Sequence, residues 1–166
     1  MGAARLFKPA HFRGDQDCSW ASLPVSASTS IRLSSISWRK PPRDAVKLNT
    51  DASVVASCAT GEGLLRTFEG KLVFAFYKEF GDVDVLMAEA LALVAGLQCC
   101  RYRNFKQILV EADSCSLVCL VNSDKVAKWP ACQVVRHVRV LLQDLNSTLS
   151  PVFRETNSAA DALATA

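Results

Sequence analysis

The chain has 166 residues, of which 50% are hydrophobic and 21% charged, a composition typical of one soluble globular domain that excludes a largely disordered protein. The formal net charge of +3 is too small to indicate a nucleic-acid partner by itself. The longest apolar run, residues 85–97, is shorter than the roughly 20 residues that span a bilayer and contains Glu89, so we expect no membrane partner.

Residues 1–37 differ from the rest of the chain because serine recurs along them and no helical or strand periodicity persists. This pattern predicts a disordered leader. Basic residues outnumber acidic ones in the same segment, which leaves an organelle transit peptide as an alternative to an uninformative tail.

The ordered domain is expected to span residues 38–166, beginning near Trp38. Apolar and polar residues alternate over residues 46–51, which predicts a half-buried first strand. A second apolar segment covers residues 61–65, a turn follows at Glu69-Gly70, and residues 72–77 are rich in aromatic and branched side chains. Three strands joined by short turns predict an antiparallel meander.

The pattern changes to helical spacing over residues 85–100, where a helix should be buried on most faces. Residues 108–112 form a short apolar run of strand length, which we expect to pair in parallel with the first strand. Ser114 is placed to cap a helix that continues through Val121.

A further helix is predicted from Trp129-Pro130 to residue 145, followed by a last short strand over residues 150–153. Asn157 is then expected to cap a final helix. The predicted order is β-β-β-α-β-α-α-β-α, which belongs to the α/β class.

Four carboxylates occupy notable places in this order: Asp51 on the first strand, Glu89 on the buried helix, Asp113 at the end of the fourth strand and Asp161 in the opening turn of the last helix. Each aspartate also has a purely structural explanation, as a turn residue, a helix cap or a partner of the helix dipole. Glu89 is harder to explain in this way, because a carboxylate on an apolar helix is costly to bury without a cation or donor.

Together the four residues have a chemical use, since Mg²⁺ prefers oxygen ligands from separate carboxylates. Two such ions roughly 3.5 to 4 Å apart can activate a water and stabilise the departing oxygen in phosphodiester cleavage. The carboxyl ends of adjacent parallel strands, where Asp51 and Asp113 are predicted, are the usual ligand-binding edge of an open sheet.

Short motifs along the ordered chain resemble, in the same order, those of the plant ribonuclease H-like, reverse-transcriptase-associated family. They are residues 38–42 (WRKPP), 47–53 (KLNTDAS), 63–66 (GLLR), 88–93 (AEALAL) with 96–97 (GL), 110–114 (VEADS), and 154–157 (RETN) with 160–164 (ADALA). Any one motif is weak, whereas the linked set is specific and covers about residues 38–166.

The resemblance implies the ribonuclease H-like fold, a five-stranded mixed sheet in the order 3-2-1-4-5 flanked by helices. It also implies an endonuclease that hydrolyses the RNA strand of RNA-DNA hybrids with two Mg²⁺ or Mn²⁺ ions. Asp51, Glu89, Asp113 and Asp161 fall on the family's four metal-binding catalytic positions. The chain departs from the cellular enzymes in having Val152-Phe153 before Arg154 where those enzymes usually carry a histidine.

Contacts to nucleic acid are predicted at two kinds of position. Lys125 and Lys128 lie in a basic stretch, 123–140, that also holds Arg136 and Arg139 and could meet backbone phosphates. The alternative explanation, a solvated helix face, is the one that such a stretch favours on its own. Discrimination of a hybrid from duplex DNA would need contacts to 2′-hydroxyl groups. The candidates for those contacts are Asn49, Ser53 and Ser114.

The seven cysteines include no CxxC pair, and their odd number does not suit a disulfide framework, so we expect buried free thiols in a reducing compartment such as the nucleus or cytoplasm. We further expect a monomer. His137 is predicted at a solvated helix position. The leader and the short last helix suggest a fragment of a larger retroelement reading frame.

Three functional classes follow from the sequence. The first is a metal-dependent ribonuclease, favoured by the four acidic residues. The second is a module of the same fold that binds nucleic acid with weak or no cleavage, and the third is a protein-interaction module; the missing histidine and the short last helix favour these two. Fold alone does not choose among them.

Overall fold

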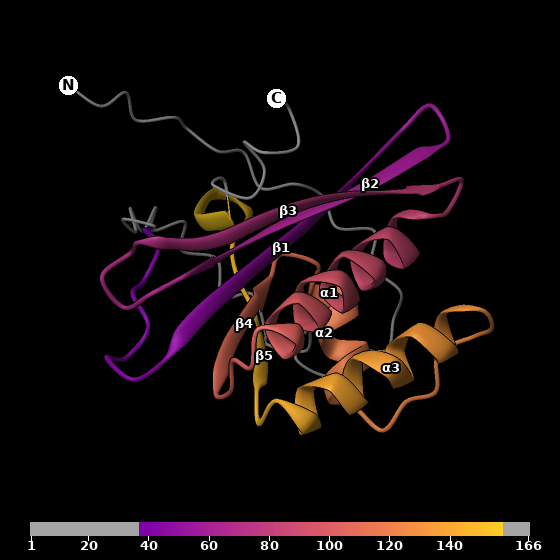
Figure 1. Ribbon diagram of the computed structural model, residues 1–166. Coiled ribbons are helices and arrows are strands. Elements are labelled where there is room, and N and C mark those ends of the chain that lie inside the picture. The colour runs from indigo at the N-terminus through magenta and orange to yellow at the C-terminus, as the bar shows by residue number, and fades with distance from the viewer. Residues whose placement is uncertain (1–36, 158–166) are drawn as a thin grey trace, which may run out of the picture. The chain divides into compact units, whose positions relative to one another are not determined.

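A computed structural model describes residues 37–157 and contains one five-stranded sheet. Its strands are β1 (Val46–Val55), β2 (Cys58–Arg66), β3 (Leu72–Gly81), β4 (Ile108–Ala112) and β5 (Thr148–Pro151). They lie side by side in the order β3-β2-β1-β4-β5, as Figure 1 shows. β1 pairs with β2, and β2 with β3, in antiparallel fashion, whereas β4 is parallel to both β1 and β5. The predicted strand order and mixed sheet are confirmed.

The turn between β1 and β2 extends both strands beyond their predicted ends. Val55 pairs directly with Cys58, so only Ala56 and Ser57 form the turn, and both have positive φ angles of 48° and 61°. A two-residue hairpin requires this conformation, for which glycine or asparagine is the usual signal. The predicted start of β2 at residue 61 was wrong because that signal is absent here. The predicted turn at Glu69-Gly70 is confirmed, with Gly70 at φ +86°.

The first strand is buried on both of its faces between Lys47 and Asp51, not half-buried as the alternation predicts. β1 is the central strand, and helix α1 (Val85–Tyr102) packs against it. The polar residues of β1 are covered from the side of Trp38, whose indole N–H donates to the Asn49 Oδ1 atom at 3.2 Å. The apolar and polar residues of β1 are therefore both buried, each against different neighbours, and their alternation does not indicate a face exposed to solvent.

Among the described residues, the helices that flank the sheet are α1, α2 (Cys115–Asn122) and α3 (Ala131–Asp144). Asp84 caps α1 by accepting a hydrogen bond from the Met87 N–H, and Ser114 caps α2 by accepting one from the Leu117 N–H, as predicted for Ser114. Figure 1 shows α1 and α3 lying together beside the sheet, and these two helices pack against each other.

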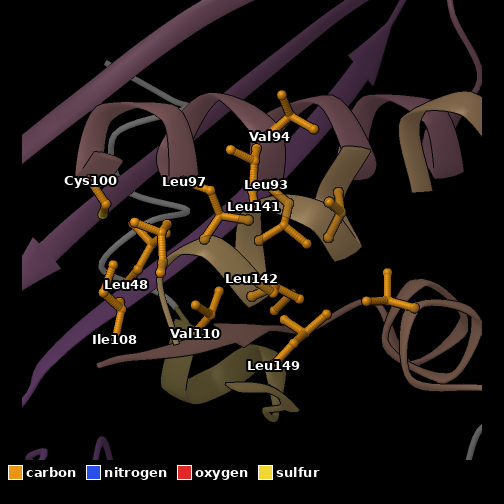
Figure 2. Close-up of a cluster of buried hydrophobic side chains, with 14 of the residues drawn as sticks. Leu48, Leu93, Val94, Leu97, Cys100, Ile108, Val110, Leu141, Leu142 and Leu149 are labelled. Carbon is orange, nitrogen blue, oxygen red and sulfur yellow. The ribbon is translucent and has the colours of Figure 1, made fainter. Parts of the chain in front are cut away.

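The hydrophobic core lies between the sheet and these helices. Figure 2 shows Leu48 of β1 and Val110 of β4 facing Leu93 and Leu97 of α1 and Leu141 of α3. All five side chains are almost fully inaccessible to solvent. Burial of each such side chain contributes about 1.5 to 3 kcal/mol, so this layer fixes the position of α1 relative to β1 and β4.

Within the described residues, α1 alone has the length and hydropathy that a membrane span requires, and 56% of it is buried inside the fold. This burial is typical of a core helix.

The chain after α3 departs from the predicted boundaries. β5 begins at Thr148, two residues before the predicted start and two residues after Asn146, which turns the chain with a φ of 48°. A helical turn then covers residues 154–157, and Asn157 lies within it rather than at a cap position. The final helix predicted after Asn157 lies outside the described residues. The Asn157 side-chain amide donates instead to the Thr50 carbonyl at 2.9 Å, which ties this turn to β1.

The six cysteines among the described residues are free thiols, as expected, but only Cys100 is buried. Cys58, Cys115 and Cys119 are exposed, so the expectation of burial was wrong for these three. The predicted leader before residue 37, Cys18 and Asp161 lie outside the described residues.

Candidate metal centre

Three of the predicted carboxylates meet at one edge of the sheet. Thr50 of β1 pairs with Ala112 of β4 at the last rung of their parallel ladder, so Asp51 and Asp113 follow side by side. Glu89 comes from the first turns of α1. One carboxylate oxygen from each of Asp51, Glu89 and Asp113 lies within 4.8 Å of the others.

Glu89 is buried, with 7% of its surface exposed, and its Oε2 atom has no hydrogen-bond partner among the described residues. The pKa of its carboxyl group is raised from 4.5 to about 8, and burial is the largest cause. The negative charges of Asp113, Asp51 and Glu62, in that order, contribute to this increase, and the positive charge of Arg154 opposes it. Without a cation, Glu89 therefore keeps its proton at neutral pH.

The two aspartates are held by their surroundings. Asp51 is 3% exposed, and its Oδ1 atom accepts a hydrogen bond from the Ala52 N–H at 2.8 Å. Asp113 lies near a cation, since its Oδ2 atom is 4.0 Å from the Arg154 Nε atom. The Arg154 side chain is 75% exposed, so this guanidinium faces solvent beside the acidic residues.

The oxygen atoms fit a hard divalent cation. Two oxygens bound to one Mg²⁺ ion at about 2.1 Å lie at most about 4.2 Å apart, so oxygens already within 4.8 Å of one another need only small side-chain adjustments. A buried carboxylate oxygen that lacks a donor also requires a positive partner when it is ionised. The donor set consists of carboxylates alone, which suits Mg²⁺ or Mn²⁺ better than a soft metal.

A further buried carboxylate, which the sequence analysis did not single out, lies beside Asp51. Glu62 of β2 is the register partner of Asp51 across the antiparallel pair and is 0% exposed. In the sequence it stands between Gly61 and Gly63, where it resembles part of a turn. Only the pairing register of β1 and β2 reveals its position.

Asn49 does not lie at a surface that nucleic acid could reach. It is 0% exposed, its amide nitrogen donates to Glu111 at 3.0 Å, and its oxygen accepts from Arg66 at 2.9 Å and from Trp38. This placement argues against the predicted contact at Asn49, because the whole amide serves the packing of the sheet.

Ser53 and Ser114 are half-buried, and the Ser114 hydroxyl oxygen accepts the hydrogen bond that caps α2. Ser53 lies two residues after Asp51 on β1, and Ser114 directly follows Asp113. Both hydroxyl groups are therefore close in the chain to the carboxylates.

The predicted basic stretch divides into two kinds of residue. Lys125, Lys128 and Arg136 are exposed, as is His137, which confirms the solvated position predicted for that histidine. Arg139 is different, because its guanidinium donates to backbone carbonyls of α2 and of the segment that follows it. The acceptors are Leu120 at 2.8 Å, Val121 at 3.0 Å, Ser123 at 2.6 Å and Lys125 at 3.2 Å. Arg139 holds this segment in place and is no free surface cation.

Comparison of the sequence with protein families finds that residues 49–166 match the reverse transcriptase-like family. A search of curated proteins finds no match.

Solved structures of similar architecture include RNase H1 from the halophilic archaeon Halobacterium salinarum NRC-1, with a TM-score of 0.66 and 24% identity over 72% of this chain and 93% of the archaeal chain. The N-terminal RNase H domain of a Mycobacterium tuberculosis protein also gives a TM-score of 0.66, with 19% identity over 72% of this chain and 89% of that chain. LC11-RNase H1 in complex with an RNA/DNA hybrid gives 0.64, with 17% identity over 71% and 92% of the two chains. At these identities the likeness is one of fold.

Proposed function

Because this chain belongs to the reverse transcriptase-like family and has the ribonuclease H-like fold, we propose that it is a metal-dependent endoribonuclease that hydrolyses the RNA strand of RNA-DNA hybrids. The observation that carries this proposal is the meeting of Asp51, Glu89 and Asp113, from three separate elements, within 4.8 Å. Such a convergence of carboxylates is costly for the fold and has a direct use in holding divalent ions.

In the proposed reaction, Asp51, Glu89 and Asp113 hold Mg²⁺ or Mn²⁺, and Asp161 is the fourth ligand by its place in the family's motif. Two bound ions would supply activation of a water molecule and stabilisation of the departing oxygen. Asp51 and Asp113 are rigid ligands because each directly follows the last residue pair of the β1–β4 ladder, Thr50 with Ala112. Glu89 releases its proton when a cation binds, since only its ionised form is a good ligand.

Contacts to the substrate are proposed from residues around these carboxylates. Ser53 and Ser114, which are close to Asp51 and Asp113 in the chain, offer hydroxyl groups to the sugar-phosphate strand. Lys125 and Lys128 offer exposed charges to backbone phosphates. A nucleic-acid partner is supported by the neighbour of the same fold that was solved with an RNA/DNA hybrid.

A second candidate function is binding of nucleic acid with weak cleavage or none. The two residues before the helical turn at 154–157 favour this function. Val152 and Phe153 occupy the place of the usual histidine, and Phe153 is 69% exposed. Without a titratable group there, proton transfer or product release during turnover would be slower.

Incubation of the purified protein with a labelled RNA-DNA hybrid and Mg²⁺ or Mn²⁺ tests the two functions. Cleavage by the wild-type protein that is lost in Asp51→Asn supports the enzyme. Hybrid binding by both proteins without cleavage supports the second function. If the protein neither binds nor cleaves the hybrid, a protein-interaction module is the remaining functional class.

A further inference from the structure

Phe153 is an apolar residue that the described part of the chain holds in place but does not cover. It is 69% exposed, although Thr156 and Asn157, in the helical turn that follows it, are buried. The Phe153 carbonyl accepts hydrogen bonds from the Thr156 N–H at 2.9 Å and from the Thr156 hydroxyl at 2.8 Å. The backbone at Phe153 is therefore fixed, while its side chain remains open to solvent.

A hydrogen bond on each side of Phe153 attaches this segment to the strands of the candidate metal centre. The Val152 N–H donates to the Ala112 carbonyl at 3.0 Å. The Asn157 side-chain amide donates to the Thr50 carbonyl at 2.9 Å. Thr50 and Ala112 form the last pair of the β1–β4 ladder, and each directly precedes an aspartate of that centre. The sheet therefore sets the position of the Phe153 backbone relative to the carboxylates.

The next residue in the chain, Arg154, adds a positive charge to this aromatic position. Its Nε atom is 4.0 Å from the Asp113 Oδ2 atom, and its side chain is 75% exposed. A guanidinium group binds phosphate through paired N–H donors, and an aromatic ring stacks on the face of a nucleobase. An exposed phenylalanine next to an exposed arginine thus matches a nucleotide whose base and phosphate are both accessible.

An aromatic side chain at the protein surface reaches the face of a nucleobase only where that base is unpaired, because paired bases are stacked inside the duplex. We propose that Phe153 is a stacking site for an unpaired nucleobase beside the metal centre and directs the protein to hybrids that contain an unpaired nucleotide. This inference rests on the proposed function, because it concerns nucleic acid bound at the same carboxylates. It names a substrate feature that bound metal ions do not distinguish, since they act on the sugar-phosphate strand that all hybrids share.

The test compares two hybrids of the same sequence, one fully paired and one with a single unpaired RNA nucleotide at its centre. Binding of the purified full chain is measured by fluorescence anisotropy in the presence of a chelator, which prevents cleavage. The ratio of kcat/KM for the two hybrids is then measured with Mg²⁺. In a second preparation the unpaired position carries 2-aminopurine, whose fluorescence falls when the base stacks on a ring.

Three substitutions separate stacking from other effects of the side chain. Phe153→Ala removes the ring, Phe153→Leu keeps an apolar side chain without a flat face, and Phe153→Trp keeps the ability to stack. Tyr102→Ala is the matched control, because Tyr102 is 89% exposed and lies at the end of α1, about 20 Å along the helix from Glu89. Circular dichroism verifies that each variant is folded.

We expect the wild type to prefer the hybrid with the unpaired nucleotide about tenfold, because a stack between one base and one aromatic ring has an effect of this order. Phe153→Trp and Tyr102→Ala should keep this preference and the loss of 2-aminopurine fluorescence. Phe153→Ala and Phe153→Leu should lose both.

Equal affinity of the wild type for the two hybrids would overturn the stacking role of Phe153 and leave the nuclease intact. An unchanged preference in Phe153→Ala or Phe153→Leu would do the same. A wild-type protein that neither binds nor cleaves either hybrid, with or without Mg²⁺, would overturn the proposed function and this inference with it.

Discussion

Glu89 links the ionisation of the acidic cluster to the stability of the fold. Its pKa is raised from 4.5 to about 8, so between these values the folded chain keeps a proton that the unfolded chain releases. The free energy of unfolding of the metal-free protein should therefore fall as pH rises through this window, by at most about 1.4 kcal/mol per pH unit from this group. Urea unfolding at a series of pH values in the presence of a chelator measures this slope.

Glu89→Gln should reduce the slope over the same pH range, because glutamine has no proton to release. Glu79→Gln, which changes an exposed glutamate, provides the control. Parallel pH profiles for wild type and Glu89→Gln would show that burial of Glu89 does not govern its ionisation. Saturating Mg²⁺ should abolish the trend in the wild type, since the ion displaces the proton and leaves Glu89 ionised in the folded chain, as it is in the unfolded chain.

Arg154 is the cation beside the proposed reaction centre. Its Nε atom is 4.0 Å from Asp113, and the side chain is 75% exposed, so the remaining guanidinium N–H groups are available to a phosphate group. We expect Arg154→Ala to raise KM for the hybrid about tenfold, because a hydrogen bond to a charged group contributes about 1.5 to 3 kcal/mol. Steady-state kinetics with Arg154→Lys, which keeps the charge and loses the fork, separates the two contributions.

The close approach of α1 to β2 positions Glu89 at the level of the element. A Cβ atom at Gly61 would lie 2.6 Å from the Ala92 Cβ atom and 2.5 Å from the Phe80 ring. Ala92 is three residues from Glu89 on the same helix, so pushing α1 away would also move the Glu89 carboxylate. Gly61→Ala should lower the free energy of unfolding by about 1 to 3 kcal/mol, as overpacked cores do.

Urea unfolding and Mn²⁺ titration of Gly61→Ala measure both effects, and Gly61→Ala with Ala92→Gly is the matched double variant. We expect the second substitution to restore part of the stability, because it removes the contact with the helix. If Gly61→Ala alone is as stable as the wild type and binds Mn²⁺ equally, the packing of α1 on β2 does not set the geometry of the acidic cluster.

The elements that the sequence predicted well are those whose signals are local. The run at residues 108–112 and the capping serine, Ser114, gave β4 and the start of α2 to the residue. The resemblance to a family then supplied the strand order. The two-residue turn at Ala56 and Ser57 could not be predicted, because its positive φ angles are imposed by the pairing of the strands and not by turn-forming residues.

Only those residues of the candidate site that belong to a sequence motif could be predicted. Asp51, Glu89 and Asp113 were singled out from their places in the element order, whereas Glu62 depends on a register between two strands that no local pattern specifies. Asn49 is the opposite case, because its alternation with apolar residues is typical of the exposed face of a half-buried strand. Trp38 and Arg66 cover it, and this packing is tertiary.

For the whole molecule, an exposed basic segment connects α2 with α3. Lys125 and Lys128 are exposed there, and Trp129 is 78% exposed. Arg139 holds the backbone of this segment through the carbonyls of Ser123 and Lys125, so the two lysines extend from a fixed support. A fixed pair of charges can contribute to phosphate binding with little loss of chain entropy.

Replacement of both Lys125 and Lys128 by alanine should weaken hybrid binding and flatten its dependence on salt. Each lost phosphate contact reduces the slope of log K against log salt by about 0.7 to 0.9, so the double variant should lose up to about 1.8. Cleavage at saturating hybrid should persist, because neither lysine belongs to the carboxylate cluster. Lys71→Ala with Lys106→Ala is the matched control, since both lysines lie next to the strand ends opposite Asp51 and Asp113. Equal salt slopes for the two double variants, measured by fluorescence anisotropy, would place the nucleic acid elsewhere on the molecule.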